Sequence, residues 1–339
     1  MSEWKTYKLG DVVAMRNGKK RPKEEGTYPV YGGNGILDYT NKYNAENVIV
    51  VGRVGAYCGS VYRCKQKCWI SDNAICVQSK SIIDDNFLFY LMSSLDFHHF
   101  HIGGAQPLLT QDIIGSFEIS LPSLTEQKRI ADILSAIDDK IELNRRINAN
   151  LEQQAQALYK SWFVDADSTG WETKRLADFF NVITGKKDAN YSTKDGVYPF
   201  FTCSQDILKA PNYSFEGAAI LLAGNGDFNV KRYIGKFEAY QRTYVLIPFE
   251  KRYHSFLYLL IKYHLQEITG GSRGSVIKFI TKGNIADFTF TMPPYSIDEK
   301  LSLFDSLFNE IDKNITEINN LSTIRDTLLP KLMSGEITV

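Results

Sequence analysis

The sequence repeats one plan in its two halves, and each copy ends in a long stretch with the periodicity of an amphipathic helix. Residues 4–11 (WKTYKLGD) return as residues 171–178 (WETKRLAD), and Gly18-Lys19-Lys20 returns as Gly185-Lys186-Lys187. The offset between matching positions drifts only from 167 at Trp4 to 171 at Pro122. Solenoid repeats have periods of about 20–50 residues. The sequence therefore predicts two similar domains in one chain, related as a pseudo-two-fold repeat.

Length and composition place the chain among globular proteins. Its 339 residues suit two or more domains of about 100–150 residues each. No stretch approaches the roughly 20 apolar residues of a membrane span, and the first residues, MSEWK, lack the apolar core of a signal peptide. We therefore expect a cytoplasmic protein without a membrane partner.

The cysteines favour reduced thiols and no metal site. Their number is odd, there is no export signal, and the first four are spaced C-x5-C-x3-C-x7-C, without the paired short knuckles of zinc sites. We expect them to be small apolar side chains on neighbouring strands. They are Cys58, Cys64, Cys68, Cys76 and Cys203.

The net charge of zero hides an uneven distribution. Residues 1–120 and 166–291 have net charges of +1 and +4, whereas residues 121–165 and 292–339 have −1 and −4. The basic excess in both globular regions is compatible with a polyanionic partner, without requiring one.

Two apolar stripes predict two long helices. In the first, positions at heptad spacing from Ile130 to Trp162 are apolar except Asn144 and Asn148. The two starts, at Thr125 and Ser296, resemble N-caps. At about 1.5 Å per residue each helix would be a rod of roughly 55 Å. The second stripe consists of Ile297, Leu301, Phe304, Phe308, Ile311, Ile315 and Ile318.

Such stripes must be covered, either by a second copy of the chain or by each other. We favour antiparallel pairing within the chain, because the two stripes are present at high effective concentration and the intervening residues leave room to return. Asn144 and Asn148 would then specify register at the seam; the alternative is that they face solvent.

Each globular half is predicted to be an α+β domain. Short apolar runs such as 47–51, 74–77, 218–222 and 243–247 read as strands separated by Asn-Gly turns, and single short helices are expected at 87–92 and 255–261. The expected domains are 1–122 and 166–293, and the expected long helices with their flanks are 123–165 and 294–339.

The helical regions resemble those of the specificity subunits of type I restriction-modification enzymes. The similarity lies in LPSLTEQKRIA at 121–131, with Leu134 and Asp138, and in LPKLMSGEI at 329–337. Ile297-Asp298-Glu299-Lys300 departs from Thr125-Glu126-Gln127-Lys128 in the first copy.

The resemblance implies a non-catalytic subunit that reads a bipartite, asymmetric DNA site, with one half-site for each target-recognition domain. It also implies that the helices hold two methyltransferase subunits and, through them, restriction subunits. The chain itself would need no cofactor; S-adenosylmethionine, ATP and Mg²⁺ would act in the partners. A stiff rod between two domains would set a fixed spacer on B-DNA.

Candidate DNA contacts follow from side-chain chemistry. Lysine, arginine and small polar groups contact phosphates, whereas Arg reads guanine and Asn or Gln reads adenine. The candidates in the first half are Lys19, Lys20, Arg21, Tyr31, Asn34, Arg53 and Gln106. Those in the second half are Lys186, Lys187, Ser204, Gln205, Asn225, Arg242 and Arg273.

Catalytic motifs are weaker. Met292-Pro293-Pro294-Tyr295 resembles the motif of adenine methyltransferases, but a thioether replaces the Asn or Asp that would accept a hydrogen bond from the adenine amino group. His98, His99 and His101 beside Asp96 could hold a metal, but the consecutive His98 and His99 point in different directions on any regular element, so we predict no metal or catalytic site there. The alternative functions are a coiled-coil assembly scaffold without DNA readout and a zinc enzyme built on the cysteines.

Overall fold

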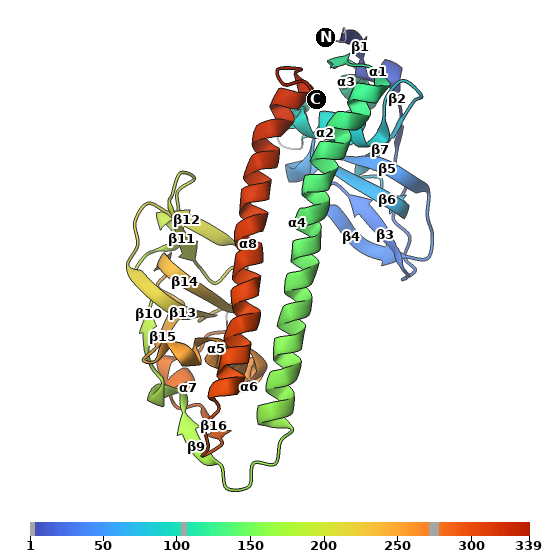
Figure 1. The fold of residues 1–339 in the computed structure, drawn as a ribbon. Coiled ribbons are helices and arrows are strands. Elements are labelled where there is room, and N and C mark those ends of the chain that lie inside the picture. The colour runs from blue at the N-terminus through green and yellow to red at the C-terminus, as the bar shows by residue number, and fades with distance from the viewer. Residues whose placement is uncertain (1–3, 103–106, 271–277) are drawn as a thin grey trace. The chain divides into compact units, whose positions relative to one another are not determined.

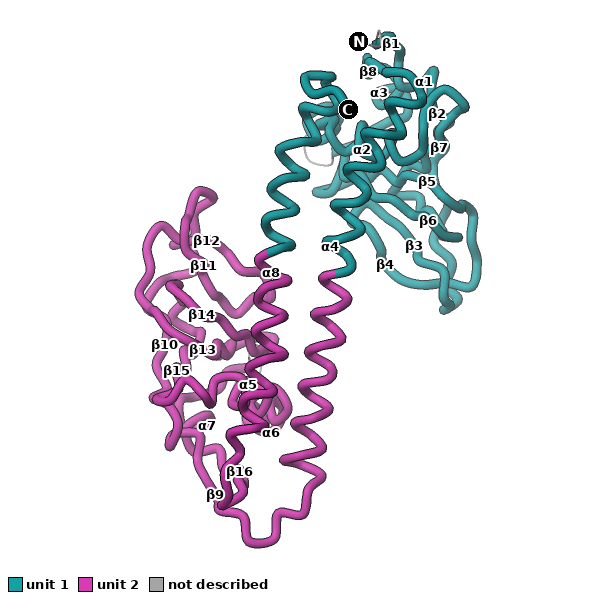
Figure 2. Tube along the Cα trace, viewed as in Figure 1, with its two compact units in different colours: residues 1–143, 317–339 teal, residues 144–316 magenta. Residues whose placement is uncertain are grey.

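The structure, a computed structural model, describes residues 4–102, 107–270 and 278–339. Its internal contacts divide the chain into two compact units, residues 1–143 with 317–339 and residues 144–316 (Figure 2). Among the described residues, each unit contains a six-stranded sheet, a two-stranded sheet and short helices (Figure 1). Each also contains part of the two long helices, α4 (Leu124–Tyr159) and α8 (Asp298–Met333). The fold class predicted from the sequence is confirmed.

The two large sheets have the same strand order. It is β2-β7-β5-β6-β3-β4 in unit 1 and β10-β15-β13-β14-β11-β12 in unit 2, while β1 pairs with β8 and β9 with β16. The unit 1 strands are β1 (Lys5–Lys8), β2 (Val13–Asn17), β3 (Tyr28–Gly32), β4 (Gly35–Thr40), β5 (Ala45–Gly52), β6 (Val61–Ile70), β7 (Ala74–Ser79) and β8 (Glu118–Leu121). Those of unit 2 are β9 (Glu172–Arg175), β10 (Phe180–Thr184), β11 (Tyr198–Phe201), β12 (Ile207–Ala210), β13 (Phe215–Ala223), β14 (Val230–Ala239), β15 (Thr243–Pro248) and β16 (Thr289–Met292).

The central strand of each sheet is apolar on both faces because both faces are covered. In β5, Ile49 and Val51 join the larger core of unit 1, whereas Val48 and Val50 join a smaller core on the opposite face. In β13, Ile220 and Leu222 alternate in the same way with residues 219 and 221. This explains why these strands read as unbroken apolar runs rather than alternating ones.

Short helices cover the larger core of each unit. The Asp84 carboxylate caps α2 by accepting hydrogen bonds from the backbone of Asn86 and Phe87, and Thr110 and Thr281 cap α3 and α7. The two predicted helices lie within α2 and α5. The short helices are α1 (Leu9–Val12), α2 (Asp85–Ser94), α3 (Gln111–Gly115), α5 (His254–Tyr263), α6 (Leu265–Gly270) and α7 (Lys282–Ala286).

The starts of the long helices differ in one detail from the sequence prediction. The hydroxyl of Ser123, not Thr125, accepts a hydrogen bond from the first turn of α4, at 3.3 Å from the Glu126 nitrogen. Thr125 is already inside the helix, because Leu124 is its first residue. In α8, Ser296 Oγ accepts from the Asp298 nitrogen at 3.2 Å, so the predicted role of Ser296 is confirmed. A π-helical turn, Lys160–Val164, follows α4.

The two long helices pair antiparallel within the chain, as predicted. In unit 1, Asp138 of α4 accepts a hydrogen bond from Arg325 of α8 at 2.8 Å. In unit 2, Asn314 Nδ2 donates to Asn148 Oδ1 at 2.8 Å, and Asn148 Nδ2 donates to the Ile311 carbonyl at 3.4 Å. Asn144 is 1% exposed. The seam position of both α4 asparagines is therefore confirmed.

The second stripe shifts one residue earlier than the heptad prediction. Asn314 is 8% exposed, whereas Ile315, expected at the seam, is 46% exposed. Positions that repeat every 3.5 residues rotate by about 20° per heptad around an ideal α-helix, so a strict heptad pattern drifts away from the seam. The Asn148–Asn314 hydrogen bond keeps residue 314 at the seam.

Cysteines 58, 64, 68 and 76 are buried and unpaired, and Cys203 is also a free thiol of intermediate exposure. The first four pack as small apolar side chains in the two cores of unit 1, as predicted. Their expected place on neighbouring strands was wrong, because Cys58 lies outside the strands, Cys64 and Cys68 share β6, and β5 separates β6 from the β7 strand of Cys76. None of the helices in the described part of the chain is long and apolar enough to cross a membrane.

Candidate nucleic-acid interface

In unit 2, the loops that follow β10 and β13 and the turn before β15 meet at one end of the sheet. The Gly224 nitrogen donates to the Arg242 carbonyl at 2.8 Å, and the Ile280 nitrogen donates to the Gly224 carbonyl at 3.1 Å. Asn225 forms a bridge with Phe279, which joins a segment distant in sequence to the same loop. A side chain on Gly224 would place its Cβ 2.5 Å from the Arg242 oxygen, so this close approach requires glycine.

Two cavities open at this end, and Asn225 lines both. The first, of about 420 Å³, brings Asn225 together with Arg242. Its remaining lining consists of Thr184, Gly224, Gln241, Tyr244, Phe279 and Ile280. The second, of about 660 Å³, adds Ser204 and Gln205 to Asn225. Four residues predicted from the sequence, Ser204, Gln205, Asn225 and Arg242, therefore line one continuous set of loops.

Lys231, which the sequence analysis missed, supports the wall of the second cavity. Its Nζ donates to the Ser204 carbonyl at 2.6 Å and also to the Asn229 side chain. Asn229 Nδ2 in turn donates to the Cys203 carbonyl at 2.8 Å. Burial lowers the pKa of the Lys231 ammonium below its usual value. The positive charge is thus held beneath the 203–206 loop.

Gln241 is a second residue that the sequence analysis missed. Its backbone nitrogen donates to the Lys187 carbonyl at 2.8 Å, and its Nε2 donates to Asp188 at 2.7 Å. The side chain lines the first cavity beside Arg242. No local motif marks this residue, because its position depends on the pairing of β15 with β10 and β13.

Unit 1 has the same backbone arrangement with different side chains. The Arg53 nitrogen donates to the Asn73 carbonyl at 2.9 Å, and the Leu109 nitrogen donates to the Arg53 carbonyl at 2.9 Å, as Gly224, Arg242 and Ile280 do in unit 2. Gly55 and Gly226 are equivalent loop positions with φ of +76° and +72°. Arg53 thus stands where unit 2 has Gly224, and Asn73 stands where unit 2 has Arg242.

The remaining candidates of unit 1 lie in different surroundings. Lys19, Lys20 and Asn34 are exposed, the last in the β3–β4 turn, and Arg21 forms an ion pair with Asp38. Arg53 is partly buried, and its Nε has no hydrogen-bond partner among the described residues. Gln106 lies outside the described residues.

Tyr31 needs a correction, because the structure places it in the smaller core of unit 1. Its side chain is 8% exposed, and its hydroxyl donates to the Arg63 carbonyl at 3.4 Å. Burial raises the pKa of the Tyr31 phenol above its usual value. A side chain in this core is poorly placed to contact a base edge, so we do not include Tyr31 in the interface that we propose.

In unit 2, the two lysines of the repeated motif diverge. Lys187 Nζ lies 4.5 Å from the centre of the Tyr191 ring, next to the Gln241 contact. Lys186 Nζ lies 5.3 Å from the centre of the Phe215 ring, at the opposite end of β13 from Asn225. The structure therefore brings Lys187, but not Lys186, close to the two cavities. Arg273 lies outside the described residues.

The other motifs have structural surroundings of their own. Met292 ends β16 and is buried, and residues 293–297 connect that strand to α8, as expected for a segment that leads into a helix. His98 Nδ1 lies 2.9 Å from the Cys58 carbonyl, and His99 pairs with Asp96. Within the described ranges, no group of three or more His, Cys, Asp or Glu side chains is arranged to hold a metal ion.

Comparisons with known proteins agree with this arrangement. The model of a family described as "Type I restriction modification DNA specificity domain" matches residues 1–153 and 168–321. The Escherichia coli type I restriction enzyme EcoDI specificity subunit is 39% identical over 176 residues, which cover 50% of this chain and 39% of that protein. The Methanocaldococcus jannaschii type I restriction enzyme MjaIX specificity subunit is 28% identical over 284 residues, which cover 70% and 64%.

In both comparisons the match spans less than two thirds of the relative's length. The crystal structure of the type I restriction-modification S subunit from M. genitalium shares the fold over 98% of this chain and 96% of that chain, with a TM-score of 0.68 and 18% identity. Since the family model matches both halves separately, each around its own sheet and the start of its own long helix, the chain belongs to the family of type I restriction-modification specificity subunits.

Proposed function

We propose that this chain reads a bipartite, asymmetric DNA sequence, one half-site with each unit, and performs no catalysis itself. One observation carries the proposal: the two units have the same loop framework but different side chains at equivalent positions. Arg53 and Asn73 in unit 1 replace Gly224 and Arg242 in unit 2. Because Arg favours guanine and Asn favours adenine, equivalent frameworks with exchanged chemistry would read different bases.

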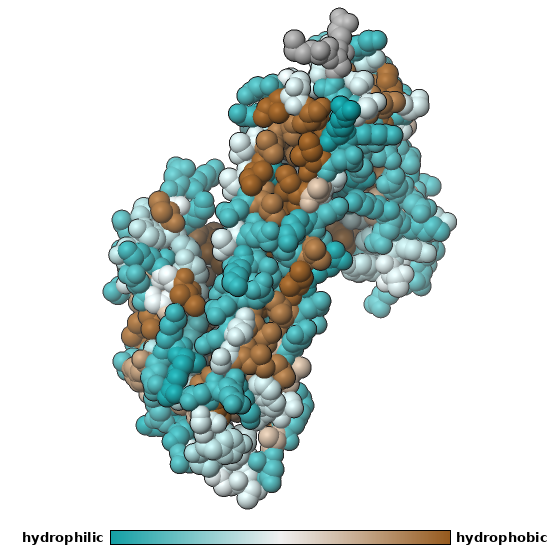
Figure 3. Space-filling view, in the orientation of Figure 1, coloured by the Kyte–Doolittle hydropathy of each residue, from teal (hydrophilic) through white to brown (hydrophobic). Residues whose placement is uncertain are grey.

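The long helices would carry the partner subunits. Figure 3 shows apolar patches in the region of the long helices, separated by hydrophilic surface. Large apolar side chains on these helices are more than a third exposed, although single exposed apolar residues are common on proteins. Exposed apolar side chains on both helices support docking of two methyltransferase subunits and, through them, restriction subunits. The side chains are Ile133, Leu143, Leu303, Ile315 and Ile324.

Any cofactors belong to those partners under this proposal. S-adenosylmethionine would donate the methyl group in the methyltransferase subunits, and ATP with Mg²⁺ would act in the restriction subunits. The role of this chain is to position them on a chosen sequence.

The primary test is co-expression with the neighbouring methyltransferase, followed by mapping of methylated adenines by single-molecule sequencing. A bipartite asymmetric motif is expected. A stable complex that leaves the genome unmethylated would instead favour the alternative, an assembly scaffold without DNA readout. Exchange of residues 185–293 for the matching segment of a relative should then change one half-site and leave the other half-site and the spacer intact.

Single substitutions locate the readout. We expect Arg242→Ala and Asn225→Ala to relax positions in the second half-site only, each by about 1–3 kcal/mol of discrimination if the contact is bidentate. Arg175→Ala is the matched control, because Arg175 lies on the two-stranded sheet and pairs with Asp178 and Asp287. Equal effects of Arg242→Ala and Arg175→Ala would refute the assignment of the interface.

A further inference from the structure

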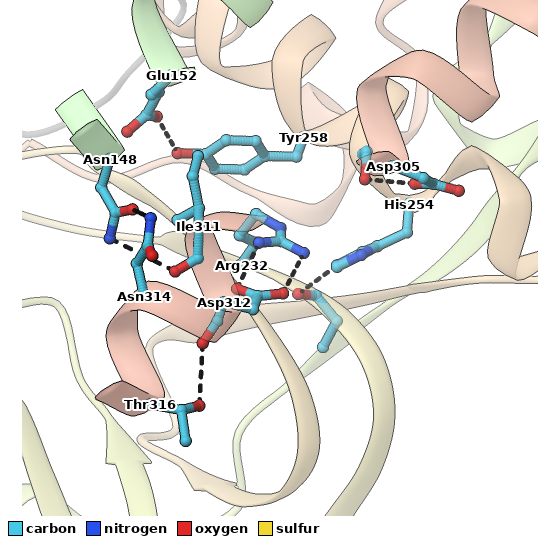
Figure 4. Close-up of polar contacts among 12 residues, drawn as sticks. Asn148, Glu152, Arg232, His254, Tyr258, Asp305, Ile311, Asp312, Asn314 and Thr316 are labelled. Atoms are coloured by element: carbon cyan, nitrogen blue, oxygen red, sulfur yellow. Dashed lines mark hydrogen bonds and ion pairs between the residues drawn. The ribbon is translucent and has the colours of Figure 1, made fainter. Parts of the chain in front are cut away.

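Arg232 of β14 joins the sheet of unit 2 to α8 through a two-pronged ion pair. Its Nη1 and Nη2 atoms donate to Oδ1 and Oδ2 of Asp312 at 2.8 and 2.9 Å (Figure 4). The guanidinium carbon also lies 4.6 Å from the centre of the Phe308 ring. The Arg232 side chain is 9% exposed. A bidentate pair restrains angle as well as distance, because both donors must face both acceptors.

Neighbouring contacts engage the same face of α8. Ser255 of α5 donates from its hydroxyl to Asp305 at 2.6 Å, one helical turn before Phe308. Asp305, Phe308 and Asp312 are spaced three and four residues apart, so they share one side of the helix. Beside them, His254 bonds to the Ala219 carbonyl at 3.0 Å and ties α5 to β13 (Figure 4). Rotation of the sheet about the α8 axis is therefore restrained along two helical turns.

Unit 1 has different contacts at the equivalent position. In unit 1, Arg63 occupies the position equivalent to Arg232, since it pairs with Ile49 as Arg232 pairs with Ile220. Arg63 instead lies 6.0 Å from the centre of the Phe89 ring. The globular part of unit 1 contacts α4 through the Tyr90 hydroxyl, which donates to Asp138 at 2.8 Å, and through Gln127, whose Oε1 accepts from the Asp84 nitrogen at 2.9 Å.

Stability alone is a poor reason for the Arg232–Asp312 pair. Burial of the Arg232 guanidinium costs solvation free energy, and water screens its attraction to Asp312, whose side chain is 42% exposed, so the pair adds little stability. Arg232 Nε adds a further cost, because it is buried without a hydrogen-bond partner in the described part of the chain. Unlike apolar packing, the pair fixes the direction in which Arg232 of the sheet faces Asp312 of α8.

We propose that Arg232 and Asp312 are positioning residues that fix the orientation of the second target-recognition domain on α8 and thereby the spacer between half-sites that the chain accepts. This proposal rests on the proposed function. One base pair of B-DNA changes the separation by about 3.4 Å and the rotation by about 34°. A domain free to turn on α8 would tolerate such a change, whereas a domain held by a bidentate pair would not.

The test compares four variants in complex with the partner methyltransferase. Arg232→Met and Asp312→Asn break the pair, and the latter keeps the shape of the side chain. The exchange of Arg232→Asp with Asp312→Arg restores opposite charges. Lys313→Gln is the control, since Lys313 pairs with Glu310 at 3.2 Å and its side chain is 74% exposed. Methylation rates are measured on duplexes that carry both half-sites with the native spacer, one base pair fewer and one more.

We expect Arg232→Met and Asp312→Asn to lower the preference for the native spacer by about tenfold, the scale of about 1.4 kcal/mol, while both half-site sequences stay the same. The charge exchange should recover part of the preference, and Lys313→Gln should match the unsubstituted protein. Either of two results overturns the proposal: an unchanged spacer preference in both pair-breaking variants, or loss of second half-site readout at every spacing. If the unsubstituted protein methylates no bipartite motif, the proposed function fails instead.

Discussion

His254 should make unit 2 lose stability at mildly acidic pH. The residue begins α5, is 2% exposed, and its Nε2 lies 3.0 Å from the Ala219 carbonyl on β13. The pKa of the His254 imidazole is lowered from 6.5 to about 4, chiefly because of burial; the Ala219 carbonyl opposes this change, and the positive charge of Arg232 contributes to it. The folded protein therefore holds this imidazole neutral.

The sign follows from proton binding. Between pH 6.5 and about 4, the unfolded chain binds a proton at His254 and the folded protein does not, so acidification favours unfolding. The penalty is nearly absent above pH 6.5, grows as the pH falls and levels off below about 4. Each tenfold change in proton affinity corresponds to about 1.4 kcal/mol, so the full loss in the free energy of unfolding is about 3 kcal/mol. About 2 kcal/mol of this loss is expected between pH 7 and pH 5.

Urea unfolding at pH 7 and pH 5 measures this effect, with tryptophan fluorescence reporting on Trp162 and Trp171, which pack against the core of unit 2. In His254→Gln, the loss of stability between the two pH values should be about 2 kcal/mol smaller than in the unsubstituted protein. His99→Gln is the control, because the His99 side chain is 75% exposed. The same pH dependence in His254→Gln and in the unsubstituted protein would refute the reasoning.

Three further predictions concern other contacts. Asn314→Ala should lower the free energy of unfolding by about 1–3 kcal/mol, because it leaves Asn148 Oδ1 without its donor at the helix seam. Replacing both asparagines by leucine should be close to neutral. Urea unfolding distinguishes the two variants, and equal losses of stability would contradict the pairing. Gly224→Ala should impair only the second half-site in methylation mapping, because its Cβ would meet the Arg242 carbonyl at 2.5 Å; a change in the first half-site would count against this. Tyr31→Phe should leave the methylated motif unchanged, because Tyr31 lies in the core.

Local periodicity accounts for most of what the sequence predicted correctly. A period near 3.5 over many residues indicates a long helix with one apolar edge, and it located both helices and the seam positions of Asn144 and Asn148. Unbroken apolar runs located β5 and β13. The errors are also local: Thr125 was expected to cap α4, and Ile315 was expected at the seam. Each lies within two residues of the residue that has the role, where periodicity cannot separate neighbours.

The residues of the candidate site were also predicted only in part from the sequence. Asn225 and Arg242 could be chosen from the sequence because their residue types suit base contacts and Asn225 lies in a glycine turn. Tyr31 has a suitable type as well, yet it faces the core, since the side a strand residue faces depends on which face of the sheet is covered.

By itself, the sequence determined the duplication, the long paired helices and the family to which the chain belongs, because these depend on residues close together or on repeated order. Only the tertiary structure decided that Gln241 lies beside Arg242 in one cavity, that Lys231 supports the 203–206 loop and that Arg232 reaches Asp312 on α8. These contacts join residues up to 80 positions apart. They depend on a strand order in which some sheet neighbours, such as β10 and β15 or β11 and β14, are separated in sequence by other strands, and no local pattern encodes that order.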